Sequence, residues 1–309
     1  MNIVGLDELI FGVDDVAACS RFLIDYGLKD VGAGRFEAID GTAIVLRHKD
    51  DPSLPPGMET ASMLRETVHG VADIATLDAI EAELRSDREV TRHGGVLRCV
   101  DDVGFALAFQ VTVRRPFALP AEAVNAPGAL AQRGINVPGV RVDADSSPRT
   151  LSHVVYFVPD VPKAEAFYTR LGFLVTDRLL GAGPFLRPAG THDHHTLFLI
   201  QTPPHMKGIE HFTFHLGGPT EVMFAGTRLV EKGYQSFWGP GRHQMGSNWF
   251  WYFNSPLGCH VEYDADMDLL DPSWQPREML AGADSSQAFL LQYREKWAPG
   301  GPPPTAGGH

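Results

Sequence analysis

The pattern of apolar and polar positions near the N-terminus recurs farther along the chain, where residues 6–28 align without gaps on residues 151–173, an offset of 145 positions. Each copy opens with an apolar run of about seven residues, which predicts a strand, and continues into a predicted helix. An acidic residue, Asp15 or Asp160, lies between the two, where its side chain can cap the helix. We therefore interpret the chain as a tandem duplication.

The ends of these helices carry matching signals. Gly27 in the first copy and Gly172 in the second suit the left-handed turn that closes a helix. Pro162 falls in a first helical turn, where its missing N–H costs no hydrogen bond.

A second strand and helix follow in each copy. They are predicted at Val68–Ala72 and Thr76–Ser86 in the first copy, and at His211–Leu216 and Thr220–Lys232 in the second, with Gly233 as a stop. Further strands are predicted at Val96–Val100, Phe105–Val111, Trp249–Phe253 and His260–Tyr263. The predicted fold class is α+β, with two tandem domains that each contain two βαβββ modules.

The length of 309 residues also favours two domains. We expect a first domain over residues 1–120, a linker rich in Ala, Pro and Gly over 121–148, and a second domain over 149–270. The remainder, 271–309, is expected to be a C-terminal tail with one helix at Ser285–Trp297 and a Pro/Gly-rich end that cannot bury enough apolar surface to order itself.

Composition and charge narrow the possible partners. The net charge of −12 disfavours nucleic acid and anionic membranes, since both require a basic surface. No apolar run approaches the roughly 20 residues of a membrane span, and no secretion signal is recognisable. Three scattered cysteines, Cys19, Cys99 and Cys259, form no disulfide framework. A small-molecule partner and a cytoplasmic location are expected.

Histidines concentrate in the second copy, where nine of the thirteen lie between residues 153 and 260. Within the strand predicted at His211–Leu216, alternation puts His211, Thr213 and His215 on one face. The same rule puts His260, Glu262 and Asp264 on one face of the last strand. A solvated outer face would explain either strand taken alone.

Comparison of the two copies favours a metal site instead. Three ligand-type residues appear in the second copy only: His153 at the position of Glu8, His211 at that of Glu66, and Glu262 at that of Ala108. His69 in the first copy is three residues out of register with His211. Two neutral imidazoles and one carboxylate form the facial triad suited to non-haem Fe(II), so one metal per chain is expected, in the second domain.

An ordered set of segments carries a family resemblance: Ser152–Val158, His194–His195, Glu210–Phe212, Gly239–His243, Tyr252 and Glu262–Tyr263. Together these segments resemble the type I extradiol catechol dioxygenases of the vicinal oxygen chelate superfamily, over about residues 4–270. The resemblance implies a glyoxalase-like fold and Fe(II), with Mn(II) as the alternative metal, held by His153, His211 and Glu262.

The same resemblance implies roles for three more residues. His195 is expected to be the acid/base residue, with His194 as the alternative. His243 and Tyr252 are expected to hydrogen-bond the catecholate or the iron-bound oxygen. Where many family members carry an acidic residue, this chain has Gly246, which leaves the preferred ring substituents open.

The expected activity is Fe(II)-dependent extradiol cleavage of a catechol-type diol with O₂, giving a 2-hydroxymuconic semialdehyde-type product in aromatic compound degradation. The expected partners are the aromatic diol, O₂ and further copies of the chain in a homo-oligomer. Candidate aromatic walls for the substrate pocket are Phe185, Phe212, Trp249 and Trp251.

Two alternatives remain at this stage. The first alternative is another metalloenzyme of the superfamily, such as a hydroquinone dioxygenase or a glyoxalase-like isomerase. The isomerase would need a fourth metal ligand, which His260 or His215 could supply. The other is a non-catalytic protein that binds a small aromatic compound or a drug, for which a complete ligand triad has no purpose.

Overall fold

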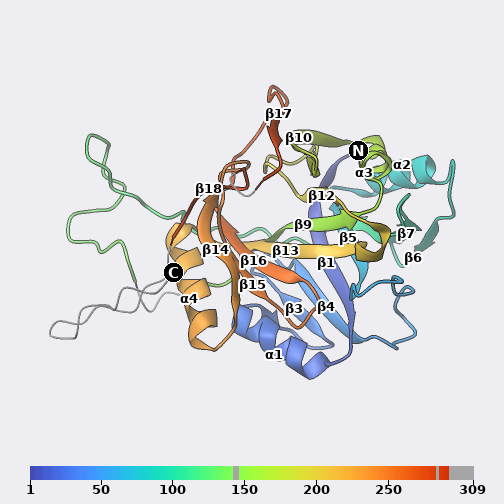
Figure 1. Cartoon of the computed structure of the whole chain (residues 1–309), viewed down its shortest axis with the longest axis horizontal. Helices are drawn as coiled ribbons and strands as arrows, with labels where there is room; N and C mark the ends of the chain where they lie inside the picture. Colours follow the sequence, from blue (N-terminus) through green and yellow to red (C-terminus); the bar gives the residue numbers. More distant parts are fainter. Residues whose placement is uncertain (142–145, 283–284, 292–309) are drawn as a thin grey trace.

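A computed structural model describes residues 1–141, 146–282 and 285–291 of the chain (Figure 1). The first domain forms an eight-stranded sheet in the order β2-β3-β4-β1-β5-β8-β7-β6. Its elements are β1 (Ile3–Val13), α1 (Val16–Tyr26), β2 (Lys29–Asp30), β3 (Arg35–Glu37), β4 (Ala43–His48), β5 (Leu64–Val71), α2 (Ile74–Leu84), β6 (Thr91–His93), β7 (Val96–Val100) and β8 (Ala106–Val111).

The second domain repeats this plan in a ten-stranded sheet, in the order β17-β10-β11-β12-β9-β13-β16-β15-β14-β18. Its elements are β9 (Thr150–Val158), α3 (Val161–Arg170), β10 (Phe173–Leu180), β11 (Gly183–Pro188), β12 (Leu197–Gln201), a 3₁₀ turn (Pro204–Met206), β13 (Gly208–His215), α4 (Pro219–Glu231), β14 (Ser236–His243), β15 (Trp249–Asn254), β16 (His260–Ala265), β17 (Arg277–Leu280) and β18 (Gln287–Leu290).

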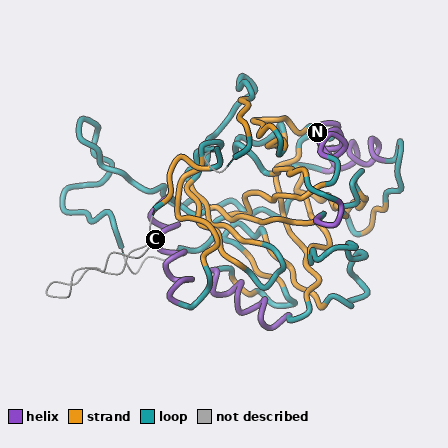
Figure 2. Tube along the Cα trace, in the orientation of Figure 1, coloured by secondary structure: helices purple, strands orange, loops and turns teal. Residues whose placement is uncertain are grey.

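The two sheets share a central order, with β4-β1-β5-β8 in one and β12-β9-β13-β16 in the other. The element order divides into four βαβββ modules, two in each domain, so the predicted fold class is confirmed. Helices lie at the periphery and strands occupy the middle of the molecule (Figure 2). None of the described helices combines the length and apolar character needed to cross a membrane.

The predicted helix signals are observed. Oδ1 of Asp15 accepts a hydrogen bond from the backbone N–H of Ala18, and Oδ1 of Asp160 accepts one from Lys163. Gly27 closes α1 with φ of 105°, in the left-handed region that glycine adopts without steric cost. These local interactions start and stop the helices where the repeat predicts them.

The first domain supports one strand of the second from behind. Tyr26, at the end of α1, stacks on Tyr263 of β16 with ring centroids 4.2 Å apart. The Tyr263 hydroxyl donates to the Tyr26 carbonyl, and the Tyr26 hydroxyl donates to the backbone carbonyl of Glu262. Because side chains alternate along a strand, Tyr263 and Glu262 lie on opposite faces of β16. The first domain therefore fixes the strand whose other face carries Glu262.

The prediction of a helix at Ser285–Trp297 is wrong for residues 285–291, the part of this range that the structure describes. Residues Gln287–Leu290 form strand β18, which pairs with the edge strand β14, and residues 292–297 lie outside the described chain. The edge of β14 offers unpaired backbone N–H and C=O groups, and pairing with them overrides a local helical preference. The preceding strand β17 pairs with β10 at the other edge of the sheet.

The described parts of the predicted linker, residues 121–141 and 146–148, contain neither helix nor strand, and residues 121–141 project from the body of the molecule (Figure 1). This agrees with its high content of Ala, Pro and Gly.

Candidate metal centre

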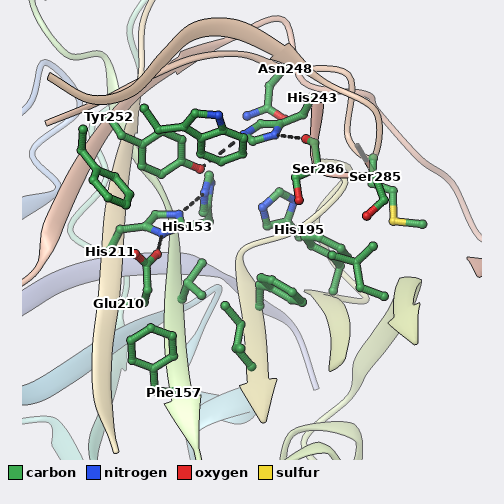
Figure 3. A pocket seen from close by; sticks show the side chains of 18 residues that line it. His153, Phe157, His195, Glu210, His211, His243, Asn248, Tyr252, Ser285 and Ser286 are labelled. Carbon is green, nitrogen blue, oxygen red and sulfur yellow. Dashed lines mark hydrogen bonds and ion pairs between the residues drawn. The ribbon is translucent and has the colours of Figure 1, made fainter. Parts of the chain in front are cut away.

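A cavity of about 330 Å³ opens into the second domain. Its polar lining comes from β9, β13, β14 and β15, from the loop between β14 and β15, from the segment before β12, and from the turn before β18 (Figure 3). The polar side chains that line it are His153, His195, Glu210, His211, His243, Asn248, Tyr252, Ser285 and Ser286.

Three neighbouring strands bring the predicted ligands together. His153 on β9 lies opposite Thr213 on β13, which in turn lies opposite Glu262 on β16. Nε2 of His153 is 3.3 Å from Nε2 of His211 and 3.1 Å from Oε2 of Glu262. Nε2 of His211 is 3.5 Å from the same carboxylate oxygen. All three side chains are buried, so their donor atoms converge on one point away from solvent.

The outer hydrogen bonds of this group suit a bound cation. Nδ1 of His211 contacts the carboxylate of Glu210, which can only accept a hydrogen bond when ionised, so the Nδ1–H donates. Nδ1 of His153 lies 2.9 Å from the hydroxyl of Ser152. With protons on both Nδ1 atoms, both Nε2 atoms present lone pairs to each other and to a carboxylate. Such a convergence is stable around a divalent metal, and the residues present therefore fit one.

The carboxylates around the group are held ionised. Burial raises the pKa of Glu262, but the neighbouring imidazoles of His153 and His243 outweigh it and leave that pKa well below its usual range. Burial likewise opposes ionisation of Glu210, yet the charges of His211 and His260 lower its pKa to about 2. Oε1 of Glu262 is buried and faces Nε2 of His243 at 3.4 Å, while Oε2 faces the two ligand nitrogens.

The equivalent positions of the first domain are occupied by ion pairs. Glu8 pairs with Arg35 and Glu66 pairs with Arg98, at 2.5 and 2.9 Å. Within the described ranges, the His153 group is the one set of three His, Cys, Asp or Glu side chains with converging ligand atoms. His69, which resembled a ligand in the sequence, is instead buried against Phe109 in the core.

The three predicted catalytic side chains line the same cavity (Figure 3). The ring of His195 lies 4.3 Å from that of His153, centroid to centroid. Burial and the neighbouring charge of His153 lower the pKa of His195 well below its usual value, so its imidazole is neutral near pH 7. Nε2 of His243 is 3.3 Å from the hydroxyl of Tyr252.

The C-terminal segment completes this side of the cavity. Nδ1 of His243 is 2.7 Å from the backbone carbonyl of Ser286, and because a carbonyl only accepts, the Nδ1–H donates. Nε2 of His243 then faces the hydroxyl of Tyr252 and Oε1 of Glu262, at 3.3 and 3.4 Å.

His194, the alternative acid/base residue, does not line the cavity. It is fully buried, with Nε2 2.8 Å from the carboxylate of Asp177 and Nδ1 3.0 Å from Nδ1 of His195.

Neither candidate fourth ligand joins the metal group. Burial lowers the pKa of His215, but Asp264 and Asp193 outweigh it and raise the value to about 10, so the ring is protonated and has no lone pair for a metal. His260 hydrogen-bonds the carboxylate of Glu210 and stacks on Phe237.

Of the four predicted aromatic walls, only Phe185 lines the cavity. Phe212 packs on Phe11 between the domains, Trp249 contacts Phe289, and Trp251 is buried in the core. Strand alternation turns these three away from the site. The apolar lining residues are Val155, Phe157, Leu179, Phe185, Phe198, Ile200, Phe237, Trp238 and Met245.

Several lining residues were not predicted from the sequence. Glu210 precedes a predicted ligand, and the rule that a metal-binding histidine donates its other N–H to a carboxylate could have identified it. Asn248, Ser285 and Ser286 carry no comparable signal in the sequence.

Comparison with known proteins gives consistent matches. Residues 150–263 match the model of the Glyoxalase/Bleomycin resistance protein/Dioxygenase superfamily. The chain is 30% identical over 291 residues to biphenyl-2,3-diol 1,2-dioxygenase of Paraburkholderia xenovorans (strain LB400), covering 89% of this chain and 91% of that protein. It is 36% identical over 154 residues to metapyrocatechase 2 of Cupriavidus necator, a match that spans 49% of this chain and less than half, 46%, of that relative.

Among solved structures, the Mn(II)-bound glyoxalase from Novosphingobium aromaticivorans superposes with a TM-score of 0.72 at 22% identity. The superposition covers 93% of this chain and 90% of the glyoxalase. At this identity the likeness concerns the fold.

Proposed function

The chain belongs to the extradiol dioxygenases of the Glyoxalase/Bleomycin resistance protein/Dioxygenase superfamily, and we propose that it uses O₂ to open the ring of an apolar aromatic diol next to the diol. The observation that carries the proposal is the convergence of two imidazoles and one carboxylate at the floor of an apolar cavity. A product of the 2-hydroxymuconic semialdehyde type follows from cleavage at that position.

The donor set supports a metal that keeps several coordination positions for other ligands. His153, His211 and Glu262 would hold it, with Glu210 orienting His211. Such a metal, when bound, supplies the centre at which a diolate and O₂ react with each other. We propose Fe(II) because two histidines and one carboxylate are typical of non-haem iron oxygenases. Mn(II) suits similar nitrogen and oxygen ligands and is the alternative.

The residues around the centre suit proton transfer and orientation. We propose that His195, neutral at pH 7, accepts a proton from a substrate hydroxyl and returns it later in the reaction. His243 and Tyr252 on the opposite side would orient the substrate oxygens, since both point polar atoms toward the metal group (Figure 3).

The walls favour an uncharged ring substituent. Neither lysine nor arginine is found among the described residues that line the cavity, and the carboxylate of Glu210 adds negative charge. A substrate carboxylate would therefore lose its hydration without gaining a cationic partner. Catechols with apolar substituents, from alkylcatechols to bicyclic diols, are the proposed substrate class.

The proposed cellular setting follows from the sequence. The three cysteines are unpaired, and free thiols suit the reducing environment of the cytoplasm.

A matched pair of substrates tests this proposal. We expect 4-methylcatechol to support oxygen uptake and the appearance of a yellow product, and 3,4-dihydroxybenzoate to react with kcat/KM at least about 100-fold lower, because its carboxylate would be buried unpaired. The measurement uses an oxygen electrode and absorbance with iron-loaded protein. Equal kcat/KM for the two compounds would contradict the proposed substrate class. If neither compound supports oxygen uptake, and catechol and dihydroxybiphenyl do not either, the proposed reaction is contradicted.

A further inference from the structure

A row of buried polar side chains leads away from the cavity behind His195. Nδ1 of His195 is 3.0 Å from Nδ1 of His194, and Nε2 of His194 is 2.8 Å from Oδ2 of Asp177. Both His194 and Asp177 are fully buried. The row therefore connects the side chain that faces the substrate to a carboxylate that does not touch the cavity.

The C-terminal segment fixes Asp177 in place. Strand β17 pairs in parallel with β10, with Arg277 opposite Asp177. The backbone N–H of Arg277 donates to Oδ1 of Asp177 at 2.8 Å, and its guanidinium donates to Oδ2 at 2.5 Å. Burial raises the pKa of Asp177, but hydrogen bonds from His194 and Arg277 outweigh it and keep this pKa below its usual value. Asp177 is thus a carboxylate, which can only accept hydrogen bonds.

The chemistry of the three groups sets the direction of every hydrogen bond in the row. Because Asp177 only accepts, the proton of His194 lies on Nε2. With the ring proton of His194 on Nε2, its Nδ1 is an acceptor, so the Nδ1–H of His195 donates a hydrogen bond to it. With its proton on Nδ1, His195 presents an unprotonated Nε2 to the cavity.

The loop over His194 holds this ring in position. Gly246, with φ of 84°, crosses above it, and a Cβ at this position would lie 3.1 Å from Nδ1 of His194. The ring is therefore enclosed between this loop and Asp177, which restricts its rotation.

We propose that Asp177 is a positioning residue that acts through His194 to fix the tautomer of His195, so that Nε2 is the atom ready to accept the proton of a substrate hydroxyl. The inference rests on the proposed function, in which His195 exchanges that proton. Asp177 itself touches neither the metal ligands nor the cavity.

The tautomer can be measured without turnover. Full-length protein labelled with ¹⁵N-histidine and loaded with Zn(II), which is diamagnetic, gives ring-nitrogen shifts, and the signals of His195 are assigned by their loss in His195→Gln. We expect a protonated Nδ1 and an unprotonated Nε2 for His195 in the wild type. A proton on Nε2 would overturn the proposal whatever the variants do. Because this readout is independent of oxygen chemistry, it separates the inference from the proposed reaction.

The substitution Asp177→Asn tests the role in turnover. With the amide oxygen at the Oδ1 position, the backbone N–H and Nε of Arg277 keep their acceptor, while the amide N–H₂ takes the Oδ2 position and Nη2 of Arg277 loses its bond. The N–H₂ then faces His194 and forces the opposite proton positions along the row, ending with a proton on Nε2 of His195. We expect kcat to fall about 100-fold with KM and metal content unchanged, since a wrong histidine tautomer removes the base without disturbing binding. The ¹⁵N spectrum should show the reversed tautomer.

Trp274→Phe is the matched structural control. The indole N–H of Trp274 donates to the carbonyl of Thr176, so this change loosens the C-terminal segment on β10 while leaving Asp177 and His194 paired. We expect kcat within about twofold of wild type, because no group that acts on substrate is altered. A loss of kcat in Trp274→Phe equal to that in Asp177→Asn, or a wild-type kcat in Asp177→Asn, would overturn the positioning role.

Discussion

Replacing Glu262 or His153 with alanine is expected to abolish both metal retention and turnover. Each substitution removes one of three protein ligands. Residues that only support a ligand contribute about 10–100-fold to metal affinity, so the removal of a ligand itself should lower metal affinity by more than about 100-fold. The remaining two donor atoms would also lose the geometry that the three adjacent strands impose. Metal analysis after gel filtration and oxygen uptake measure the two effects.

The first domain provides the control for this prediction. Glu66→Ala alters the carboxylate at the position equivalent to His211, which pairs with Arg98 and not with a metal. We expect this variant to retain stoichiometric metal and wild-type turnover, with some loss of stability because Arg98 loses its partner. Tight, stoichiometric metal in Glu262→Ala would show that the ion is held elsewhere.

His195→Gln is expected to retain the metal and to lower turnover by about 10²–10⁴-fold, the usual contribution of a positioned acid/base group. Glutamine fills similar space and can hydrogen-bond His194, but it cannot accept a proton at neutral pH. KM should change little, because the metal and the opposite wall, including His243 and Tyr252, remain in place. Steady-state kinetics with metal analysis on the same samples give both quantities.

The control is His192→Gln, a nearby histidine whose Nδ1 contacts the backbone carbonyl of Leu270 and which does not line the cavity. It should leave kcat unchanged. Loss of metal in His195→Gln would place His195 among the ligands, and unchanged turnover would remove it from the acid/base role.

The fold was predictable because its signals are local and repeated. Apolar runs, Asp15 and Asp160 as caps, and the offset between the two copies locate the four described helices and the strand before each of them without reference to distant residues. The predicted ligands could be proposed for the same reason: a difference between two copies at equivalent strand positions identifies His153 and His211 before any contact is known.

The remainder of the site depends on contacts that no local pattern encodes. Ser285 and Ser286 reach the cavity because β17 and β18 add to opposite edges of the second sheet, which strand pairing decides. Asp177 on β10 meets His194, which lies in the segment before β12, because the sheet order places β10 and β12 on either side of β11. The error in the predicted aromatic walls has a different cause. Period-two alternation places Phe212 and Trp251 on the opposite strand face from the residues next to them in sequence, but it does not identify which face of the sheet encloses the cavity.

The fate of molecular oxygen tests the central claim most directly. Iron-loaded protein is supplied with an apolar catechol under ¹⁸O₂, and the product is analysed at once by mass spectrometry. Extradiol cleavage predicts one O₂ consumed per diol and a product carrying two ¹⁸O atoms, apart from exchange of the aldehyde oxygen with water. Ring opening with no ¹⁸O in the product, or no oxygen consumption by protein shown to contain iron, would contradict the account.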